Sequence, residues 1–274
     1  MRIRLSHRTS YEYETPARAV IQLLRMTPRP HDGQQVMRWH IEIDADANVR
    51  RGEDALGNIT HAAFVEGPLS RLVVSVTGEV ETWDTSGVLR GTVERFPPEV
   101  FLRETPLTQP DADLRRFALD AAGGPGDPLE KLHALMAAVS AEVVFDTAPT
   151  DAATPAAAAF ALRRGVCQDL AHVFIAAART LGAPARYVSG HLVRDDGAED
   201  QEAAHAWAEA HVPGLGWVGF DAANCLCPTP SYLRVAIGLD YLGAAPVRGS
   251  RSGGGAEHMD VKLKVGHAGQ QSQA

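Results

Sequence analysis

One amphipathic segment, residues 167–182, constrains the fold of this chain more than any other. Its apolar residues follow the i, i+3, i+4, i+7, i+8, i+11 spacing of a single helix face. They are Leu170, Val173, Phe174, Ala177, Ala178 and Leu181. Cys167 stands at the head of that face, so we expect its thiol to point inward. The segment therefore predicts a helix with one buried face and a cysteine in its first turn.

Cys167 has two interpretations at this position. The N-terminus of a helix provides partial positive charge and unpaired N–H groups, which favour a thiolate and could hold a developing oxyanion. Free cysteine is also among the most buried residue types, so the position taken alone favours packing. Asp169 is interpreted as an acid that complements the helix dipole, and His172 as an ordinary helix residue.

Residues 204–221 contain the partners that a cysteine nucleophile needs. In residues 204–212, polar and aromatic residues alternate with small apolar ones, which predicts a strand with His205 on one face. A turn at 213–216 and a second strand bring Asp221 back alongside. A thiolate enzyme needs a base within hydrogen-bond reach and a third group that orients this base. A histidine and an aspartate on paired strands meet that need.

The register of this hairpin decides whether the two side chains can meet. Residues directly opposite each other on antiparallel strands point to the same face. His205 and Asp221 therefore share a face only if the hairpin loop has an odd number of residues, or if a bulge intervenes. We predict an odd loop, such as Val212 to Gly216.

The order of predicted elements indicates an α+β protein. Strand patterns are predicted at 3–14, 36–45, 58–66 and 69–83, so we interpret residues 1–100 as an antiparallel β domain, and a proline-rich connection lies at 94–110. Helices are predicted within 111–122, 127–145 and 154–165, the second with Asp127 as N-cap and the third starting after Thr154 and ending at Gly165. Later strands are predicted at 185–193, 204–212, 216–222, 233–238 and 258–266. We predict a catalytic core over 101–265 and a disordered tail over 266–274.

Composition excludes several classes of function. The net charge of −8 argues against nucleic-acid binding, which needs clustered Lys and Arg. No apolar run reaches the length of a membrane span, and no secretory signal is visible at the N-terminus, so we expect no membrane contact and a cytoplasmic location. Three cysteines make a disulfide framework improbable there. His7, His40 and His61 lack metal-ligand spacing and are interpreted as ordinary strand residues.

Several blocks of the chain resemble the bacterial transglutaminase-like family, relatives of papain-type thiol enzymes. "TPAAAAFALRRGVCQDLAHVFIAAARTLGAPARYVSGHL" resembles its cysteine block, and "AHAWAEAHVPGLGWVGFDAAN" resembles its histidine and aspartate block. "GLDYLGAAPVRG" with "HMDVKLKV" resembles its C-terminal end. "YEYETPARAVIQLLRMTPRP" and "DALGN" resemble the β-rich region that precedes the core. The resemblance covers nearly the whole chain.

The resemblance implies a papain-like core, in which the cysteine helix packs on a sheet that carries the other two residues. It also implies that Cys167 is the nucleophile, His205 the general base and acid, and Asp221 the orienting carboxylate. No cofactor and no metal are implied. The family often has Ser before the histidine and Pro-Thr after the aspartate, where this chain has alanines at 204, 222 and 223. The side-chain oxyanion donor is not assigned, because Gln168 points about 100° away from its neighbour in a helix.

The leading hypothesis is acyl transfer on peptide or isopeptide amides through a thioester, with hydrolysis favoured over transamidation and a peptide or protein as substrate. The alternative is a non-catalytic peptide-binding module with the same fold, motivated by the alanines beside the site. A third hypothesis is a metal site at Cys225, Cys227 and His191, although "CLC" lacks zinc-pair spacing. The acidic segment 195–202 is interpreted as a solvated loop, or as a selector of basic substrates.

Overall fold

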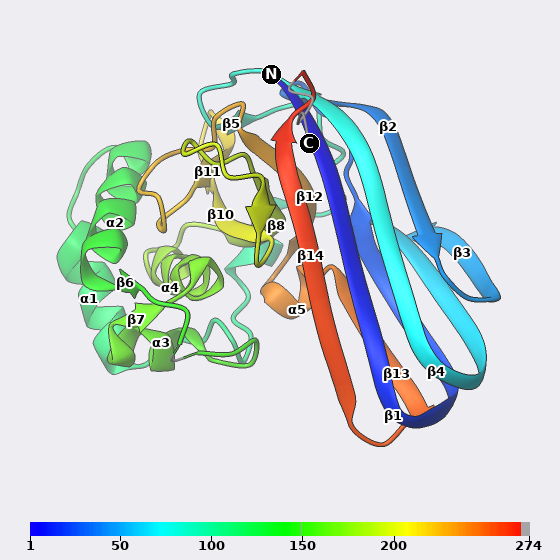
Figure 1. The fold of residues 1–274 in the computed structure, drawn as a ribbon. Helices are drawn as coiled ribbons and strands as arrows, with labels where there is room; N and C mark the ends of the chain where they lie inside the picture. The colour runs from blue at the N-terminus through cyan, green and yellow to red at the C-terminus, as the bar shows by residue number, and fades with distance from the viewer. Residues whose placement is uncertain (149, 270–274) are drawn as a thin grey trace.

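The computed structural model describes residues 1–148 and 150–269, and it confirms the α+β class (Figure 1). One large antiparallel sheet and one smaller antiparallel sheet lie side by side, and the helices cluster against the smaller sheet. The large sheet has the strand order β2-β4-β1-β14-β9, with β13 on β1 and β3 on β4. Its strands are β1 (Arg2–Thr27), β2 (Gln34–Ile43), β3 (Ala47–Glu53), β4 (Ile59–Thr82), β9 (Asp200–Gln201), β13 (Val247–Gly253) and β14 (Glu257–His267).

The long antiparallel pair β1 and β4 forms the middle of the large sheet. The sequence predicted two strands, 58–66 and 69–83, where the structure has the single strand β4. Pairing resumes past Gly67 after a register shift, and a Cβ at Gly67 would lie 2.0 Å from the Ala17 carbonyl oxygen. Only glycine allows the two backbones to approach so closely. The interruption in the pattern therefore marks a close contact inside one strand and not the end of a strand.

The large sheet takes its strands from both ends of the chain. β14 pairs with β1 from Ile3↔His267 to Tyr13↔Glu257, and β13 pairs with the second half of β1. Residues beyond 240 therefore complete a sheet that begins in residues 1–100. β14 continues to His267, into the segment predicted to be a disordered tail, and 270–274 of that segment lie outside the described residues.

The smaller sheet has the order β12-β8-β10-β11-β5 and carries the predicted hairpin. Its strands are β5 (Val88–Leu89), β8 (Ala185–Leu192), β10 (His205–Val212), β11 (Gly216–Phe220) and β12 (Tyr232–Gly238). The helical elements are η1 (Pro98–Leu102), α1 (Ala112–Ala122), α2 (Pro128–Glu142), α3 (Ala156–Leu162), α4 (Cys167–Thr180) and α5 (Tyr241–Ala244). A short parallel pair, β6 (Val144–Phe145) and β7 (Arg164–Gly165), precedes α4.

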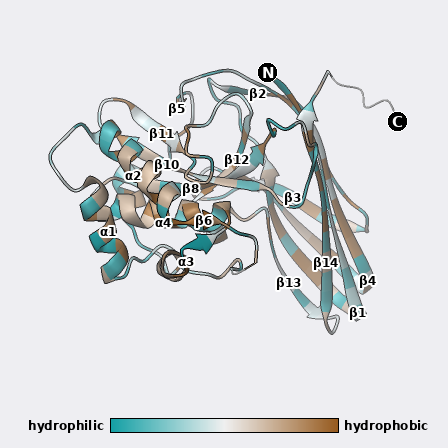
Figure 2. Cartoon of the chain, turned by 60° about the vertical axis from the view of Figure 1, so that its left-hand side comes forward, coloured by the Kyte–Doolittle hydropathy of each residue, from teal (hydrophilic) through white to brown (hydrophobic). Residues whose placement is uncertain are grey.

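Helix α4 is the centre of the core, and the prediction that it buries only one face was wrong. Every residue from Asp169 to Arg179 is buried, because α4 lies between the smaller sheet and the helices α1, α2 and α3. Figure 2 shows α4 as mainly hydrophobic, whereas α1 and α2 carry many hydrophilic residues. The polar residues on its second face have partners. Arg179 donates hydrogen bonds to the carbonyls of Phe101, Ala185 and Leu239.

The other helix boundaries agree with the sequence in part. Asp127 caps α2 as predicted and accepts hydrogen bonds from the N–H groups of Leu129 and Glu130. Helix α3 ends at Leu162 and not at Gly165, because Arg163 adopts a left-handed conformation with φ 55°. Thr154 does not cap α3, and its hydroxyl instead accepts from the Asp151 N–H. The early end of α3 leaves Arg164 and Gly165 free to pair with β6.

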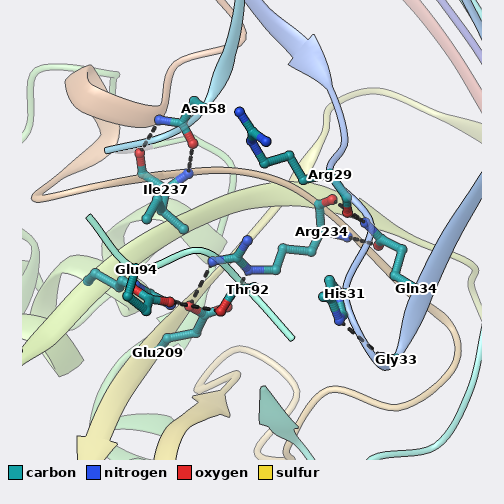
Figure 3. A network of polar contacts seen from close by, with 11 residues as sticks. Arg29, His31, Gly33, Gln34, Asn58, Thr92, Glu94, Glu209, Arg234 and Ile237 are labelled. Atoms are coloured by element: carbon teal, nitrogen blue, oxygen red, sulfur yellow. Dashed lines mark hydrogen bonds and ion pairs between the residues drawn. The ribbon is translucent and has the colours of Figure 1, made fainter. Parts of the chain in front are cut away.

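Two amide side chains from the large sheet's side of the molecule cover the outer edge of β12 (Figure 3). Gln34 accepts from the Arg234 N–H and donates to the Arg234 carbonyl, both at 2.9 Å. Asn58 makes the same pair of bonds with Ile237, both at 2.8 Å. Each amide takes the place of a neighbouring strand's peptide group. This edge of the smaller sheet is therefore paired with side chains rather than exposed.

Candidate active site

Cys167 is the first residue of α4 and is half-buried. The turn that positions it is held by Asp169, whose Oδ2 accepts the Val166 N–H at 2.8 Å and the Thr150 hydroxyl at 2.7 Å. A Cβ on Gly165 would lie 2.6 Å from the Asp169 Cβ, so a side chain there would have to displace Asp169. Burial raises the pKa of Asp169, although its hydrogen bonds to Thr150 and Val166 act in the opposite direction. Asp169 therefore caps the helix as well as complementing its dipole.

The hairpin that carries the other two predicted residues has the odd loop that we predicted. Val212 pairs with Gly216, so the loop consists of residues 213–215. It is shorter than the predicted loop 212–216 because Val212 and Gly216 still belong to the paired strands. His205 Nε2 lies 2.6 Å from Asp221 Oδ2. Asp221 follows the end of β11 and is held by reciprocal backbone hydrogen bonds with Leu226. The two side chains therefore share one face of the sheet, as the sequence predicted.

The Asp221 carboxylate is fully buried and has a hydrogen bond on every side. Its Oδ1 accepts the N–H groups of Ala223 and Asn224, at 2.9 and 3.3 Å. Its Oδ2 also accepts the Tyr232 hydroxyl at 2.6 Å and the Asn224 side-chain amide at 2.7 Å. Burial alone would raise the pKa of Asp221. The hydrogen bond and charge of His205, with the hydrogen bonds from Tyr232 and Asn224, outweigh this effect, so the pKa of Asp221 lies below its ordinary value. The carboxylate is therefore held ionised and fixed in orientation.

His205 connects this carboxylate to the thiol. Burial lowers the pKa of His205, but hydrogen bonds to Asp221 and Cys167, together with their charges, raise it to about 10. Since Nε2 is bonded to Asp221, Nδ1 is the ring nitrogen left for the thiol. The structure thus brings Cys167, His205 and Asp221 together, with a hydrogen bond between His205 and Asp221 and with Cys167 near enough to influence the pKa of His205. A cationic imidazole beside the sulfur can donate its proton to a leaving group.

Two residues of the site were missed by the sequence interpretation. Asn224 is three residues after Asp221, in "DAAN", and an amide at that spacing is the one local signal that could have found it. Tyr232 begins β12, eleven positions beyond Asp221. Nothing in the local pattern links it to the site. Trp207 completes the surroundings, with its ring stacked near His205 at 6.2 Å between centroids and set edge-on to Tyr232.

The oxyanion donor has one geometric candidate. The Gln168 side chain donates to the Ala152 carbonyl at 3.4 Å and so is directed to the loop before α3. Among the described residues the Cys167 N–H has no hydrogen-bond partner, since it is the first N–H of a helix. This N–H is therefore available to a developing oxyanion at the carbon attacked by the thiol.

The metal-site hypothesis finds no geometric support. Within residues 1–148 and 150–269, no group of at least three His, Cys, Asp or Glu side chains is placed to hold a metal ion. Cys225 is exposed, whereas His191 is buried between the two sheets with its ring 5.9 Å from that of His7. Within the same residues, no helix is long and apolar enough to pass through a membrane.

The acidic segment 195–202 is largely paired with basic residues. Asp196 forms an ion pair with Arg194, and Asp200 forms one with Lys264 on β14. Glu199 lies 4.0 Å from Arg4 on β1. These contacts connect the segment before His205 to the edge of the large sheet. Neutralised acids attract a basic substrate less than free ones.

The fold and the site together define the class: an α+β protein whose cysteine helix packs on an antiparallel sheet bearing a histidine and an aspartate. Residues 3–81 match the model of the bacterial transglutaminase-like N-terminal region, and residues 115–222 match that of the transglutaminase-like superfamily. This chain belongs to that bacterial transglutaminase-like family.

Relatives of known sequence or structure cover at least 90% of the chain. A protein of Mycobacterium leprae, itself uncharacterised, is 33% identical over 96% of this chain and 98% of its own length. An uncharacterised protein of Mycobacterium tuberculosis is 28% identical over 90% of this chain and 87% of its own. The crystal structure of a suspected cysteine protease from Cytophaga hutchinsonii has a TM-score of 0.79 at 20% identity, covering 99% of this chain and 92% of that one. This likeness shows that the two proteins share a fold.

Proposed function

We propose that this protein is a cysteine-nucleophile acyl-transfer enzyme that acts on peptide or isopeptide amide bonds and favours hydrolysis over transamidation. One observation carries the proposal: a single histidine ring is hydrogen-bonded to a buried carboxylate at 2.6 Å, and the cysteine at the start of a buried helix is near enough to raise the pKa of that histidine. A nucleophile, a base and an orienting group in this order are the requirements of covalent catalysis by a thiol.

In the first step, the Cys167 sulfur attacks the amide carbonyl carbon and forms a C–S bond. The C–N bond breaks as His205 gives its proton to the leaving nitrogen, which departs as an amine. The raised pKa of His205 keeps this proton available at neutral pH. The developing oxyanion lies where the Cys167 N–H can reach it.

In the second step, water replaces the amine. Neutral His205 removes a proton from water, the water oxygen attacks the thioester carbon, and the C–S bond breaks to release the acid and the thiolate. The charge of Cys167 contributes to the raised pKa of His205, and this contribution is absent in the thioester. The neutral imidazole is therefore easier to form at the stage that needs a base. A primary amine in place of water gives transamidation.

The test compares Cys167→Ala with Cys225→Ala, a matched loss of an exposed cysteine. Hydrolysis of a peptide library and incorporation of a fluorescent primary amine are measured for each variant, and adducts on the wild-type protein are identified by mass. We expect Cys167→Ala to abolish both reactions and Cys225→Ala to retain them. Activity that survives in Cys167→Ala rejects Cys167 as the nucleophile.

The non-catalytic module is the second candidate, favoured by alanines at 204, 222 and 223 beside the site. It predicts that iodoacetamide labels Cys167 no faster than Cys225 at pH 6, whereas the enzyme proposal predicts clearly faster labelling. The cytoplasmic location and the preference for basic substrates remain predictions.

A further inference from the structure

The two-stranded ribbon of β6 and β7 leads directly to the candidate nucleophile. Phe145 pairs with Gly165, two residues before Cys167, and the Asp146 N–H donates to the Gly165 carbonyl at 2.9 Å. Paired strands lie about 5 Å apart, and two residues span about 7 Å of extended chain. The Cα of Phe145 is therefore within about 12 Å of the Cα of Cys167. Contacts between α4 and β7 place the ribbon beside the start of the helix (Figure 1).

Large apolar side chains are exposed on β6 and at the end of α3. The exposed fractions are 62% for Val144, 56% for Phe145 and 51% for Leu162 at the end of α3. Most apolar residues of the same helical region are buried in the core. Single exposed apolar residues are ordinary, but a group of them beside a reactive side chain marks a binding surface.

The outer edge of β6 has free backbone groups as well. The Val144 N–H donates to the Arg163 carbonyl at 3.0 Å, and the Asp146 N–H donates to Gly165, so both residues face β7. Because strand residues alternate in direction, the N–H and C=O of Phe145 face the other side. Within the described residues β6 has no strand partner on that side. An extended peptide can pair with such an edge through its own backbone.

We infer that β6 is a substrate-binding edge that selects an extended peptide with an apolar side chain near the amide bond to be cleaved. This inference rests on the proposed function, because it needs a reaction at Cys167. A peptide paired with the outer edge of β6 lies about 5 Å beyond Phe145, so its residue opposite Phe145 is within about 17 Å of Cys167, a distance that extended chain at about 3.4 Å per residue covers in about five residues. The apolar residue of the substrate therefore lies within five positions of that bond and contacts Val144, Phe145 or Leu162.

The experiment uses Phe145→Ser with Phe64→Ser as the matched control. Phe64 is 40% exposed on β4 in the large sheet, so both changes remove an exposed phenylalanine from a strand. Each protein is assayed on peptides that carry Leu or Ser at each of the five positions on either side of the amide bond. Hydrolysis of a small activated ester and iodoacetamide labelling of Cys167 measure the reactivity of the thiol independently of peptide binding.

We expect the wild-type protein to prefer Leu at one position, and Phe145→Ser to lower kcat/KM for that peptide about tenfold, mainly through KM. Ester hydrolysis and labelling should stay within twofold, and Phe64→Ser should resemble the wild type. Binding of the Leu peptide to the Cys167→Ala protein, measured by fluorescence anisotropy, should weaken by the same factor when Phe145→Ser is added.

Two other results overturn the inference in distinguishable ways. The β6 site is rejected if Phe145→Ser and Phe64→Ser have equal kcat/KM and equal peptide binding while ester hydrolysis is retained. That result does not contradict the proposed function. A wild-type protein that hydrolyses neither ester nor peptide, with Cys167 labelled no faster than Cys225, rejects the proposed function and the β6 site with it.

Discussion

The Tyr232 hydroxyl donates a 2.6 Å hydrogen bond to Asp221 Oδ2, the same oxygen that is bonded to His205. Tyr232 comes from β12, whereas His205 lies on β10 and Asp221 follows β11. The orientation of the carboxylate is therefore set by a strand outside the hairpin. Burial raises the pKa of Tyr232, and so do its hydrogen bond and the charge of Asp221, so the hydroxyl remains a donor at all ordinary pH values.

Tyr232→Phe removes this donor and tests its positioning role. The Tyr232 bond lowers the pKa of Asp221, so its loss raises that pKa, and activity should fall at a higher pH as the solution is acidified. We expect kcat/KM at neutral pH to drop about tenfold, as for a lost hydrogen bond to a charged group. The pH–rate profile is the measurement, and Tyr13→Phe on β1 is the control. An unchanged acid limb contradicts a role in positioning.

The raised pKa of His205 makes the stability of the site depend on pH. The folded value of about 10 exceeds the ordinary 6.5, so the folded protein binds the proton more tightly than the unfolded chain. The stabilisation is fully present below pH 6.5 and is lost as the pH rises to about 10. Urea denaturation of the wild type and of His205→Asn should show a difference in unfolding free energy that shrinks across this range. A constant difference counts against a raised pKa.

Gly165→Ala should displace the start of α4. The added Cβ would lie 2.6 Å from the Asp169 Cβ and 2.7 Å from Asp169 Oδ2, in a turn that is buried. We expect slower alkylation of Cys167 and a lower melting temperature. Gly124→Ala is the control, since a Cβ at Gly124 meets nothing within 4 Å. Similar behaviour of the two variants indicates that the turn tolerates a side chain.

Glu209 lies at the centre of a buried charge network on the smaller sheet (Figure 3). Its carboxylate accepts from Arg234 Nε at 2.6 Å and Arg186 Nε at 2.7 Å, and Arg186 also binds Glu94. Burial raises the pKa of Glu209, but the two arginines lower it to about 2. Glu209→Ala leaves buried cations without this partner, so we expect a loss of about 3–5 kcal/mol in unfolding free energy.

Calorimetry of Glu209→Ala against Asp113→Asn measures this loss. Asp113 belongs to an exposed pair with Arg116, so its replacement should leave the melting temperature nearly unchanged. A Glu209→Ala protein as stable as this control shows that the buried arginines find other partners.

Asn58→Ala tests the amide side chains that cover β12. The change leaves the N–H and C=O of Ile237 without partners in a buried position, which costs about 1–3 kcal/mol per group. Hydrogen exchange at the Ile237 amide should accelerate strongly. Gln35→Ala, which removes an exposed amide on β2, should leave that exchange rate unchanged. Equal exchange in both variants means that another group replaces Asn58.

The sequence predicted those parts of the fold in which local pattern and tertiary packing agree. The apolar spacing of α4, the Asp127 cap and the alternation around His205 each specify an element without help from distant residues. The odd hairpin loop followed from the requirement that His205 and Asp221 share a face. The catalytic roles of these residues remain predictions, because geometry shows contact and not turnover.

The parts that were missed depend on distant contacts. β3 was not predicted because its residues are mostly exposed and lack apolar alternation, and it is held by backbone pairing with β4. The second buried face of α4 combines Ile175 with alanines and with the polar Asp169, His172 and Arg179, a mixture that does not indicate burial until α1, α2 and α3 cover it. Tyr232 could not be assigned to the site because only the sheet order brings β12 near it.

The pairing of β1 with β13 and β14 also orders events during synthesis. β1 can pair with β4 once residue 82 has been made, whereas the strands on its other side end at residues 253 and 267. A nascent chain therefore carries a long strand with one open edge until these two later strands have been synthesised, and such edges promote aggregation. Ribosome-bound chains of this protein should depend on chaperones more than their finished form does.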